Sequence, residues 1–427
     1  MDEATARIAQ GPRVLVMPGP APRGGRTDLR WASGISNSQA ISDAVSECAR
    51  QLSHGLDDLS ADLIVVFASA HYQPDYDLIP ALVLEQLSPD SDAVIIGCSA
   101  GGVIGAGREV EHAPGISIAA ASLPGVRLAQ FFIEDRDLPD PDAGPDRWIE
   151  LIGVDAAEDP QFLLMADPLS IRGESLLMGL DFAYPGAVKV GGLASGAPRS
   201  GGHVLFLGDR TLGGGAVGVA MSGDVEIDTI VAQGCRPIGD PLQITGGGSN
   251  VVTGLDGRPP LAVLTELAEQ MSDHDRTLAR HSLFIGVVMD ALTDAPRQGD
   301  FLIRNIVGID RNTGAIGVAA QVHEGQTVQF HLRDAETSAG DLRAMLYGYD
   351  GGQTLPDGSG ALMFSCLGRG SYLYGRPDHD TDMFRDRFGP VPLTGFFCNG
   401  EIGPVGGTSF LHGYTTSFGL VLPKTRG

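Results

Sequence analysis

The fold is decided by three consecutive segments: ADLIVVF at residues 61–67, DLIPALVLEQL at residues 77–87 and AVII at residues 93–96. The first and third are short, continuous apolar runs, which are typical of strands buried on both faces. The middle segment has the length and composition of a helix. Strand, helix and strand with short connections predict a βαβ unit and a parallel pair of strands.

Residues 36–52 predict an amphipathic helix ahead of this unit. Ile41, Val45, Cys48 and Leu52 follow one another at spacings of four, three and four behind a Ser/Asn cap, so they share one face. Cys48 is therefore expected in the core.

Two antiparallel pairings are expected further along the first half. Residues 115–121 are predicted to pair with residues 126–133, and residues 203–231 to form glycine-punctuated strands with a turn at Ser222-Gly223-Asp224. A composition shift across GCRPIGDPLQITGGGSN, residues 234–250, then indicates a domain boundary.

We therefore expect an α/β protein of two domains, each with mixed sheets and helices packed on them in layers. The expected parts are an N-terminal extension at 1–29, a first domain at 30–232 and a second domain at 233–427. At 427 residues the chain exceeds what one core usually organises.

Charge and cysteine content favour a cytoplasmic protein that binds neither nucleic acid nor membrane. The formal charge is 29 minus 53, or −24, with no Lys/Arg cluster to attract phosphates or anionic lipids. The N-terminus lacks a secretion signal, and no run reaches the ~18 apolar residues that span a bilayer. Five cysteines without a CxxC pair indicate free thiols in a reducing compartment.

Gly97-Cys98-Ser99-Ala100-Gly101 fits the G-x-S-x-G pattern of a serine nucleophile directly after a strand. That elbow needs a helix straight after the serine, and the glycine-broken VIGAGREVEHAPG follows instead. Cys98 has no identifiable histidine base. A turn whose main-chain N–H groups approach a ligand is the better interpretation; a plain tight turn is the alternative.

Two other patterns do not predict cofactor or metal sites. Residues 213–218 contain GxGxxG, but a strand hairpin follows, with no helix N-terminus for a pyrophosphate. Asp378-His379-Asp380-Thr381-Asp382 directly precedes MFRDRF and spans the start of a predicted helix at about 381–388, where such residues are expected as caps. No cofactor and no metal are expected.

The C-terminal half contains SCLGRG at residues 365–370 and GFFCNGEIGP at residues 395–404, each after a predicted strand. Arg369 stands between two glycines, where its guanidinium suits a carboxylate ligand. An ion pair with Glu401 is the structural alternative. His412 lies at the start of the final strand.

The chain resembles the FIST family, the F-box and intracellular signal transduction proteins. VIIGCSAGGVIG and VGGLASG (residues 190–196) resemble FIST N segments, and GCRPIGDP, LDGRP, FLIRNIVGID (residues 301–310), FHLRDA, SCLGRG and GFFCNGEIGP resemble successive FIST C segments. This ordered set extends from about residue 30 to 422. The family's signalling modules have no counterpart in the remaining length, so a separate signalling partner or self-assembly is expected.

The resemblance implies a sensory protein that binds a small ligand, an amino acid or related carboxylate metabolite, and is more consistent with a receptor than an enzyme. Arg304 and Arg333 lie in the resembling segments as carboxylate contacts or structural ion pairs. The expected ligand-binding residues are Gly97, Cys98, Ser99, Ala100, Gly101, Gly191, Gly192, Ser195, Arg304, Arg333, Cys366, Arg369, Asn399, Glu401 and His412. The alternatives are a hydrolase or transferase with Cys98, Ser99 or Cys366 as nucleophile, and a protein-recognition module.

Overall fold

The computed structural model describes residues 17–18, 28–57, 59–89, 93–197, 199, 201–350 and 354–424. The chain divides into two compact units. Unit 1 is Met1–Val231, Tyr349–Leu411 and Ser417–Gly427, and unit 2 is Ala232–Gly348 and His412–Thr416. Most of the expected N-terminal extension, residues 1–16 and 19–27, lies outside the described residues. The domain boundary that we predict between residues 232 and 233 stays a prediction. In the structure the chain enters unit 2 at Ala232 and returns to unit 1 after Gly348.

Unit 1 consists of three repeats of one order of elements. The first repeat is β2 (Arg30–Ser36), α1 (Ile41–Gly55), β3 (Leu63–Ser69), α2 (Ile79–Leu87), β4 (Val94–Ala100), β5 (Gly102–Gly105), β6 (Arg108–Glu111) and β7 (Ile116–Ser122). The second is β8 (Val126–Ile133), α3 (Pro145–Ile152), β9 (Gln161–Ala166), α4 (Gly173–Ala183), β10 (Lys189–Leu193), β11 (Leu205–Leu207), β12 (Arg210–Leu212) and β13 (Ala216–Gly223).

The third repeat is β14 (Val225–Ala232), β21 (Gly360–Cys366), α8 (Gly370–Tyr374), α9 (His379–Phe388), β22 (Leu393–Cys398), β23 (Glu401–Val405), β24 (Thr408–His412) and β25 (Thr416–Pro423). Unit 2 is inserted between β14 and β21. It therefore occupies the place in the order that α1 and α3 hold in the first two repeats.

The three repeats exchange hairpins in a cycle. Each repeat builds four neighbouring strands of one sheet, in the orders β4-β3-β7-β2, β8-β13-β9-β10 and β14-β25-β21-β22. Each sheet is then completed by another repeat's hairpin: β11–β12 joins β4, β23–β24 joins β10, and β5–β6 joins β22. The short β1 (Met17–Pro18) pairs with β8 at the far edge of one sheet.

The predicted parallel pair is confirmed and occurs three times. β3 and β4, β9 and β10, and β21 and β22 are parallel. In each pair a glycine of the second strand lies opposite the first strand: Gly97 opposite Val66, Gly191 opposite Leu164 and Gly395 opposite Met363. A Cβ on any of the three would lie 1.8 Å from the carbonyl oxygen of that opposite residue. Only glycine fits at these positions.

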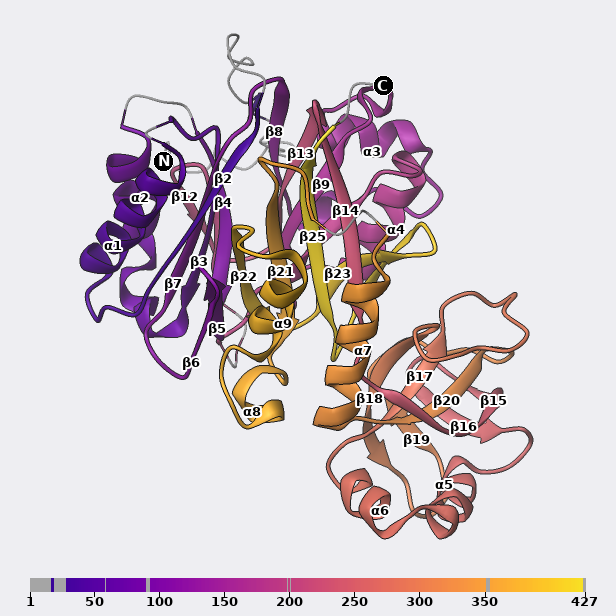
Figure 1. The fold of residues 1–427 in the computed structure, drawn as a ribbon. Coiled ribbons are helices and arrows are strands. Elements are labelled where there is room, and N and C mark those ends of the chain that lie inside the picture. The colour runs from indigo at the N-terminus through magenta and orange to yellow at the C-terminus, as the bar shows by residue number, and fades with distance from the viewer. Residues whose placement is uncertain are drawn as a thin grey trace, which may run out of the picture. The chain divides into compact units, whose positions relative to one another are not determined.

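The layers follow from the two faces of each sheet. The inner faces of all three sheets share one apolar core, with Phe67, Met165 and Phe364 among its members. Helices α1 and α2 cover the outer face of the first sheet, and α3 and α4 cover that of the second (Figure 1). The α/β fold class with mixed sheets is thus confirmed.

Unit 2 is built around a closed barrel in the order β15-β16-β19-β18-β17-β20. Its elements are β15 (Arg236–Gly248), β16 (Val251–Leu255), α5 (Pro260–Gln270), α6 (Asp273–Ala279), β17 (Leu283–Val288), β18 (Phe301–Ile309), β19 (Ile316–Val318), β20 (Thr327–Leu332) and α7 (Ala335–Gly348). Its neighbouring strands are antiparallel and enclose a separate apolar core.

Three local predictions were wrong. β7 and β8 belong to different sheets, as do β13 and β14, so neither expected hairpin forms. These turns join one repeat to the next, and local sequence does not distinguish such a link from a hairpin. α1 begins after Ala40 with no side-chain cap; instead Ser36 and Ser38 donate hydrogen bonds to Glu47 further along the helix.

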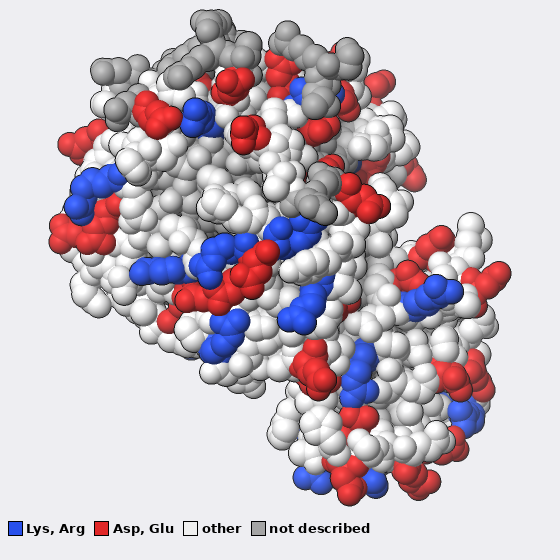
Figure 2. Space-filling model, in the orientation of Figure 1, with Lys and Arg blue, Asp and Glu red and all other residues white. Residues whose placement is uncertain are grey.

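On the face in view in Figure 2, Lys and Arg side chains are interspersed with Asp and Glu. Asp382 of α9 accepts from both Arg376 and Arg385. Among the described residues, no helix combines the length and apolar character that crossing a bilayer requires.

Candidate functional site

The ends of β4, β10 and β22, one strand from each repeat, meet around Ser195. Its hydroxyl donates to the carbonyl of Phe397 and accepts from the N–H of Gly101 at 2.8 Å. Its main-chain N–H donates to the carbonyl of Ser99 at 3.1 Å. We call this meeting point, formed by residues 99–101, 194–196, 366–367 and 397–401, the strand-end centre.

The turn between β22 and β23 joins the strand-end centre by its own hydrogen bonds. The side chain of Asn399 donates to the carbonyl of Ala194 at 2.9 Å, and its main-chain N–H donates to the carbonyl of Leu193. Asn399 is exposed, whereas Gly400 beside it is buried. The predicted segments near residues 97–101, 191–196 and 399–401 are therefore brought together.

The floor of the strand-end centre is buried and polar. Ser99, Ser195, Cys398 and Glu401 are each at most 1% exposed, and the Cys398 thiol lies 3.4 Å from a Glu401 carboxylate oxygen. Burial, Glu401 and Cys366 all raise the pKa of the Cys398 thiol well above its usual value. Burial likewise raises the pKa of Cys98.

Leu367 covers part of this floor. A Cβ on Gly101 would lie 2.3 Å from the end of the Leu367 side chain, so Leu367 packs directly on the glycine. Leu367 is 39% exposed, and Gly101 and Cys366 are half-buried. The surface over the centre therefore includes Gly101, Cys366, Leu367 and the exposed Asn399.

Arg369 does not pair with Glu401, contrary to the structural alternative. It is fully buried and forks onto Asp380 of α9 at 2.7 and 3.3 Å. Asp380 also accepts from His379. Burial alone would raise the pKa of Asp380, but Arg369 and His379 lower it to about 2.

Asp380 is therefore a partner of Arg369 rather than a cap. The helix-capping prediction for this acidic run was wrong, since the N-cap Asp378 makes no side-chain cap and accepts instead from the N–H of Glu109. Among the described residues, no group of three or more His, Cys, Asp or Glu is placed to hold a metal.

Three of the predicted residues lie in unit 2. Arg304 of β18 donates to the carbonyl of Ile303. Arg333 lies over the ring of Tyr414, 5.2 Å from its centroid. His412 is buried. Arg304 and Arg333 thus have structural contacts within their own unit.

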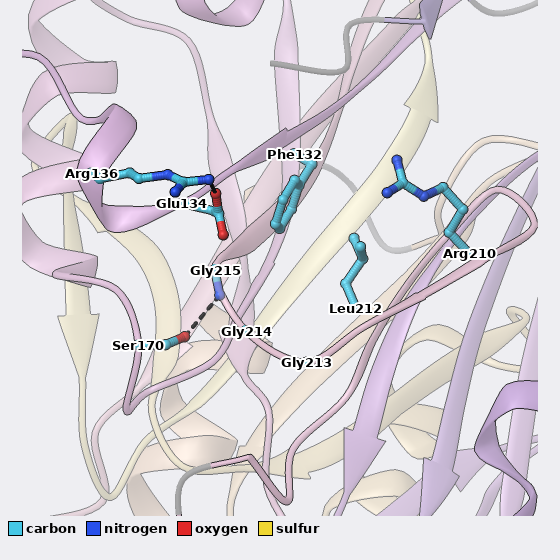
Figure 3. Close-up of a pocket in the computed structure, with 9 residues that line it drawn as sticks. All are labelled: Phe132, Glu134, Arg136, Ser170, Arg210, Leu212, Gly213, Gly214 and Gly215. Atoms are coloured by element: carbon cyan, nitrogen blue, oxygen red, sulfur yellow. Dashed lines mark hydrogen bonds and ion pairs between the residues drawn. The ribbon is translucent and has the colours of Figure 1, made fainter. Parts of the chain in front are cut away.

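A cavity of about 710 Å³ opens elsewhere in unit 1, and none of the predicted residues lines it. Figure 3 shows Arg136 and Glu134 on one side, Arg210 and Leu212 on the other, and Phe132 between them. The lining is completed by Ser170 and by Gly213, Gly214 and Gly215. The Ser170 hydroxyl accepts from the N–H of Gly215 at 2.8 Å.

A buried pair of side chains lies behind this cavity. His203 and Asp167 are each 1% exposed and hydrogen-bonded at 2.9 Å. A Cβ on Gly214 would lie 3.7 Å from Asp167. Sequence reasoning missed the pair and the cavity, although Asp167 directly follows the apolar segment that forms β9 and three consecutive glycines, 213–215, are a visible signal.

The described residues thus define an α/β protein of three repeats whose strand ends converge at Ser195, with a cavity of small-molecule size elsewhere in unit 1. Family models match in tandem: the FIST N domain over residues 62–258 and the FIST C domain over residues 260–404. The chain belongs to the FIST family, as the resemblance predicted.

Relatives match at full or partial length. An uncharacterized protein of Mycobacterium tuberculosis H37Rv is 37% identical over 395 residues, which are 92% of this chain and 99% of that protein. One of Mycobacterium bovis is 35% identical over 394 residues, with 92% and 98% covered. Human F-box only protein 22 is 31% identical over 101 residues, 23% of this chain and 25% of that protein.

Among solved structures, a cyanuric acid hydrolase of A. caulinodans aligns over 93% of this chain and 100% of its own. The TM-score is 0.34 and the identity 8%, values too low to support an inference about fold or function.

Proposed function

We propose that this FIST protein is a cytoplasmic sensor that binds a small ligand, an amino acid or related carboxylate metabolite, and passes that state to a signalling partner. The observation that carries the proposal is the meeting of β4, β10 and β22 at Ser195. In open α/β sheets, ligands bind beyond the carboxyl ends of parallel strands, and here strand ends from three repeats supply one such place.

The proposed contacts are residues of unit 1. Gly101 and Gly196 offer main chain without side chains, and Asn399 offers an exposed carboxamide. Arg369 is paired with Asp380 and the N–H of Gly101 already donates to Ser195, so the carboxylate would rely on the Asn399 carboxamide and the main chain of Gly196. Ligand entry requires Leu367 to move off Gly101.

Burial counts against the hydrolase alternative at Cys98 and Ser99. A catalytic cysteine needs thiolate character, whereas the raised pKa of Cys98 keeps it protonated at neutral pH. The Ser99 hydroxyl accepts from the N–H of Val204 and lies 3.2 Å from the carbonyl of Ser195. Among the described residues, no His, Asp or Glu side chain hydrogen-bonds to either group, and both groups are buried.

Thermal-shift screening with the twenty amino acids and a panel of small carboxylates tests the proposal. A ligand at a hundred times its Kd adds about 2.7 kcal/mol to the free energy of unfolding. Gly101→Ala fills the centre and should abolish the shift. Gly144→Ala, at an exposed position with open space around it, should preserve it.

Two results would contradict the proposal. One is the lack of any shift across the panel with a well-folded sample. The other is a shift that Gly101→Ala leaves intact, because the ligand would then bind away from the strand-end centre.

A further inference from the structure

Part of the cavity shown in Figure 3 is lined by main chain alone, because two glycines of the loop between β12 and β13 have no room for a side chain. A Cβ on Gly214 would lie 2.8 Å from the Ser170 hydroxyl. Gly215 has φ +85, and its Cβ would lie 2.5 Å from the carbonyl oxygen of Ile133. The loop between β12 and β13 can therefore carry no side chain at these two positions.

The polar lining offers hydrogen-bond donors. The Ser170 hydroxyl already accepts from Gly215, which leaves its own proton for an acceptor in the cavity. Arg210 is exposed and has no ion-pair or hydrogen-bond partner among the described residues. Arg136 is paired with Glu134 on the opposite side.

The charge of the lining has the opposite sign to that of the chain. Two arginines face one glutamate, a difference of +1, in a protein of net charge −24. Asp167 does not line the cavity and is buried in its pair with His203. A local positive excess in an acidic protein concentrates small anions at that place.

We propose that this cavity is a second ligand site, separate from the strand-end centre, that binds a small molecule through an oxyanion group, a carboxylate or a phosphate. Arg210 and the Ser170 hydroxyl are the principal contacts, because both present donors with no acceptor. Phe132 and Leu212 contact the apolar part of the ligand. The volume of about 710 Å³ lies within the usual range for small-molecule sites.

The experiment titrates succinate and inorganic phosphate, separately and at fixed ionic strength, into the full chain by calorimetry. The native chain should bind at least one of them, and Arg210→Gln should weaken binding about tenfold through loss of a charge-assisted contact. Arg210→Lys should restore part of it. Arg147→Gln removes the same charge from an exposed ion pair on α3 and should bind as the native chain does.

The outcomes separate the two oxyanion sources and the two sites. Binding of succinate alone assigns a carboxylate, and binding of phosphate alone assigns a phosphate group. Gly101→Ala should leave this binding unchanged even if it abolishes ligand binding at the strand-end centre. The proposal is overturned if neither anion binds the native chain, or if Arg210→Gln and Arg147→Gln have the same affinity.

Discussion

Gly97, Gly191 and Gly395 hold equivalent places in the three repeats, where the second parallel strand passes close to a carbonyl of the first. The sequence marks each as a glycine after an apolar strand. It does not show that the three are equivalent, because the segments around them have in common only one further glycine, five residues on, at Gly102, Gly196 and Gly400.

Gly97→Ala should therefore destabilise unit 1 severely. Its Cβ would meet main-chain atoms of Val66, which cannot move without distorting the sheet, and we expect a loss of about 3 kcal/mol. Calorimetric unfolding measures it. Gly144→Ala, which meets nothing within 4 Å, should change stability by only a few tenths of a kcal/mol; equal effects would refute the steric explanation.

Arg369 and Asp380 form a buried ion pair whose partners depend on each other. Replacing either one alone, as Arg369→Met or Asp380→Asn, leaves a buried charge without its partner and should cost about 3 to 5 kcal/mol. The double variant should cost less than the sum. Arg376→Ala, which breaks an exposed pair with Asp382, should cost at most about 1 kcal/mol. Additive losses in a double-mutant cycle would argue against direct coupling.

At the scale of elements, the hairpin β5–β6 is attached to α9 by the carboxyl group of Glu109. A Glu109 carboxylate oxygen accepts from the main-chain N–H groups of Asp380 and Thr381, at 3.1 and 3.0 Å, at the start of the helix. Burial and the neighbouring Asp380 raise the pKa of Glu109 to about 8. The hairpin of the first repeat is thus attached to the third by a carboxyl group that holds a proton at neutral pH.

This pKa predicts a pH-dependent stability. Folded Glu109 binds its proton more tightly than unfolded Glu109, whose pKa is about 4.3. Its contribution is complete below that value and is lost as pH rises through about 8. Denaturant unfolding of unit 1 between pH 5 and 9 should show a decline that Glu109→Gln removes. The same decline in both proteins would exclude Glu109 as its source.

Sequence patterns located most elements but not their partners. The predicted strands at residues 61–67 and 93–96 overlap β3 and β4, and the predicted helix at residues 77–87 contains α2, because apolar runs between turn residues report local structure. The same patterns placed β7 against β8, although β7 pairs with β2 and β3. Strand pairing depends on residues distant in sequence, which periodicity does not report.

At the scale of the whole molecule, the two units have separate apolar cores. Calorimetry of the full chain should therefore resolve two unfolding transitions. Gly97→Ala should lower the transition of unit 1 and leave that of unit 2 in place. A single transition that shifts as a whole would show that the units unfold together.

The sequence by itself determined the α/β class, the family and the positions of the segments that meet at Ser195, since these depend on local periodicity and on an ordered set of short motifs. The tertiary structure alone decided the cyclic exchange of hairpins, the pairing of Arg369 with Asp380 and the cavity beside Gly214. Each of these depends on contacts between residues far apart in the chain, such as Ser195 with Phe397, and such contacts form only when three separate sheets pack on one core.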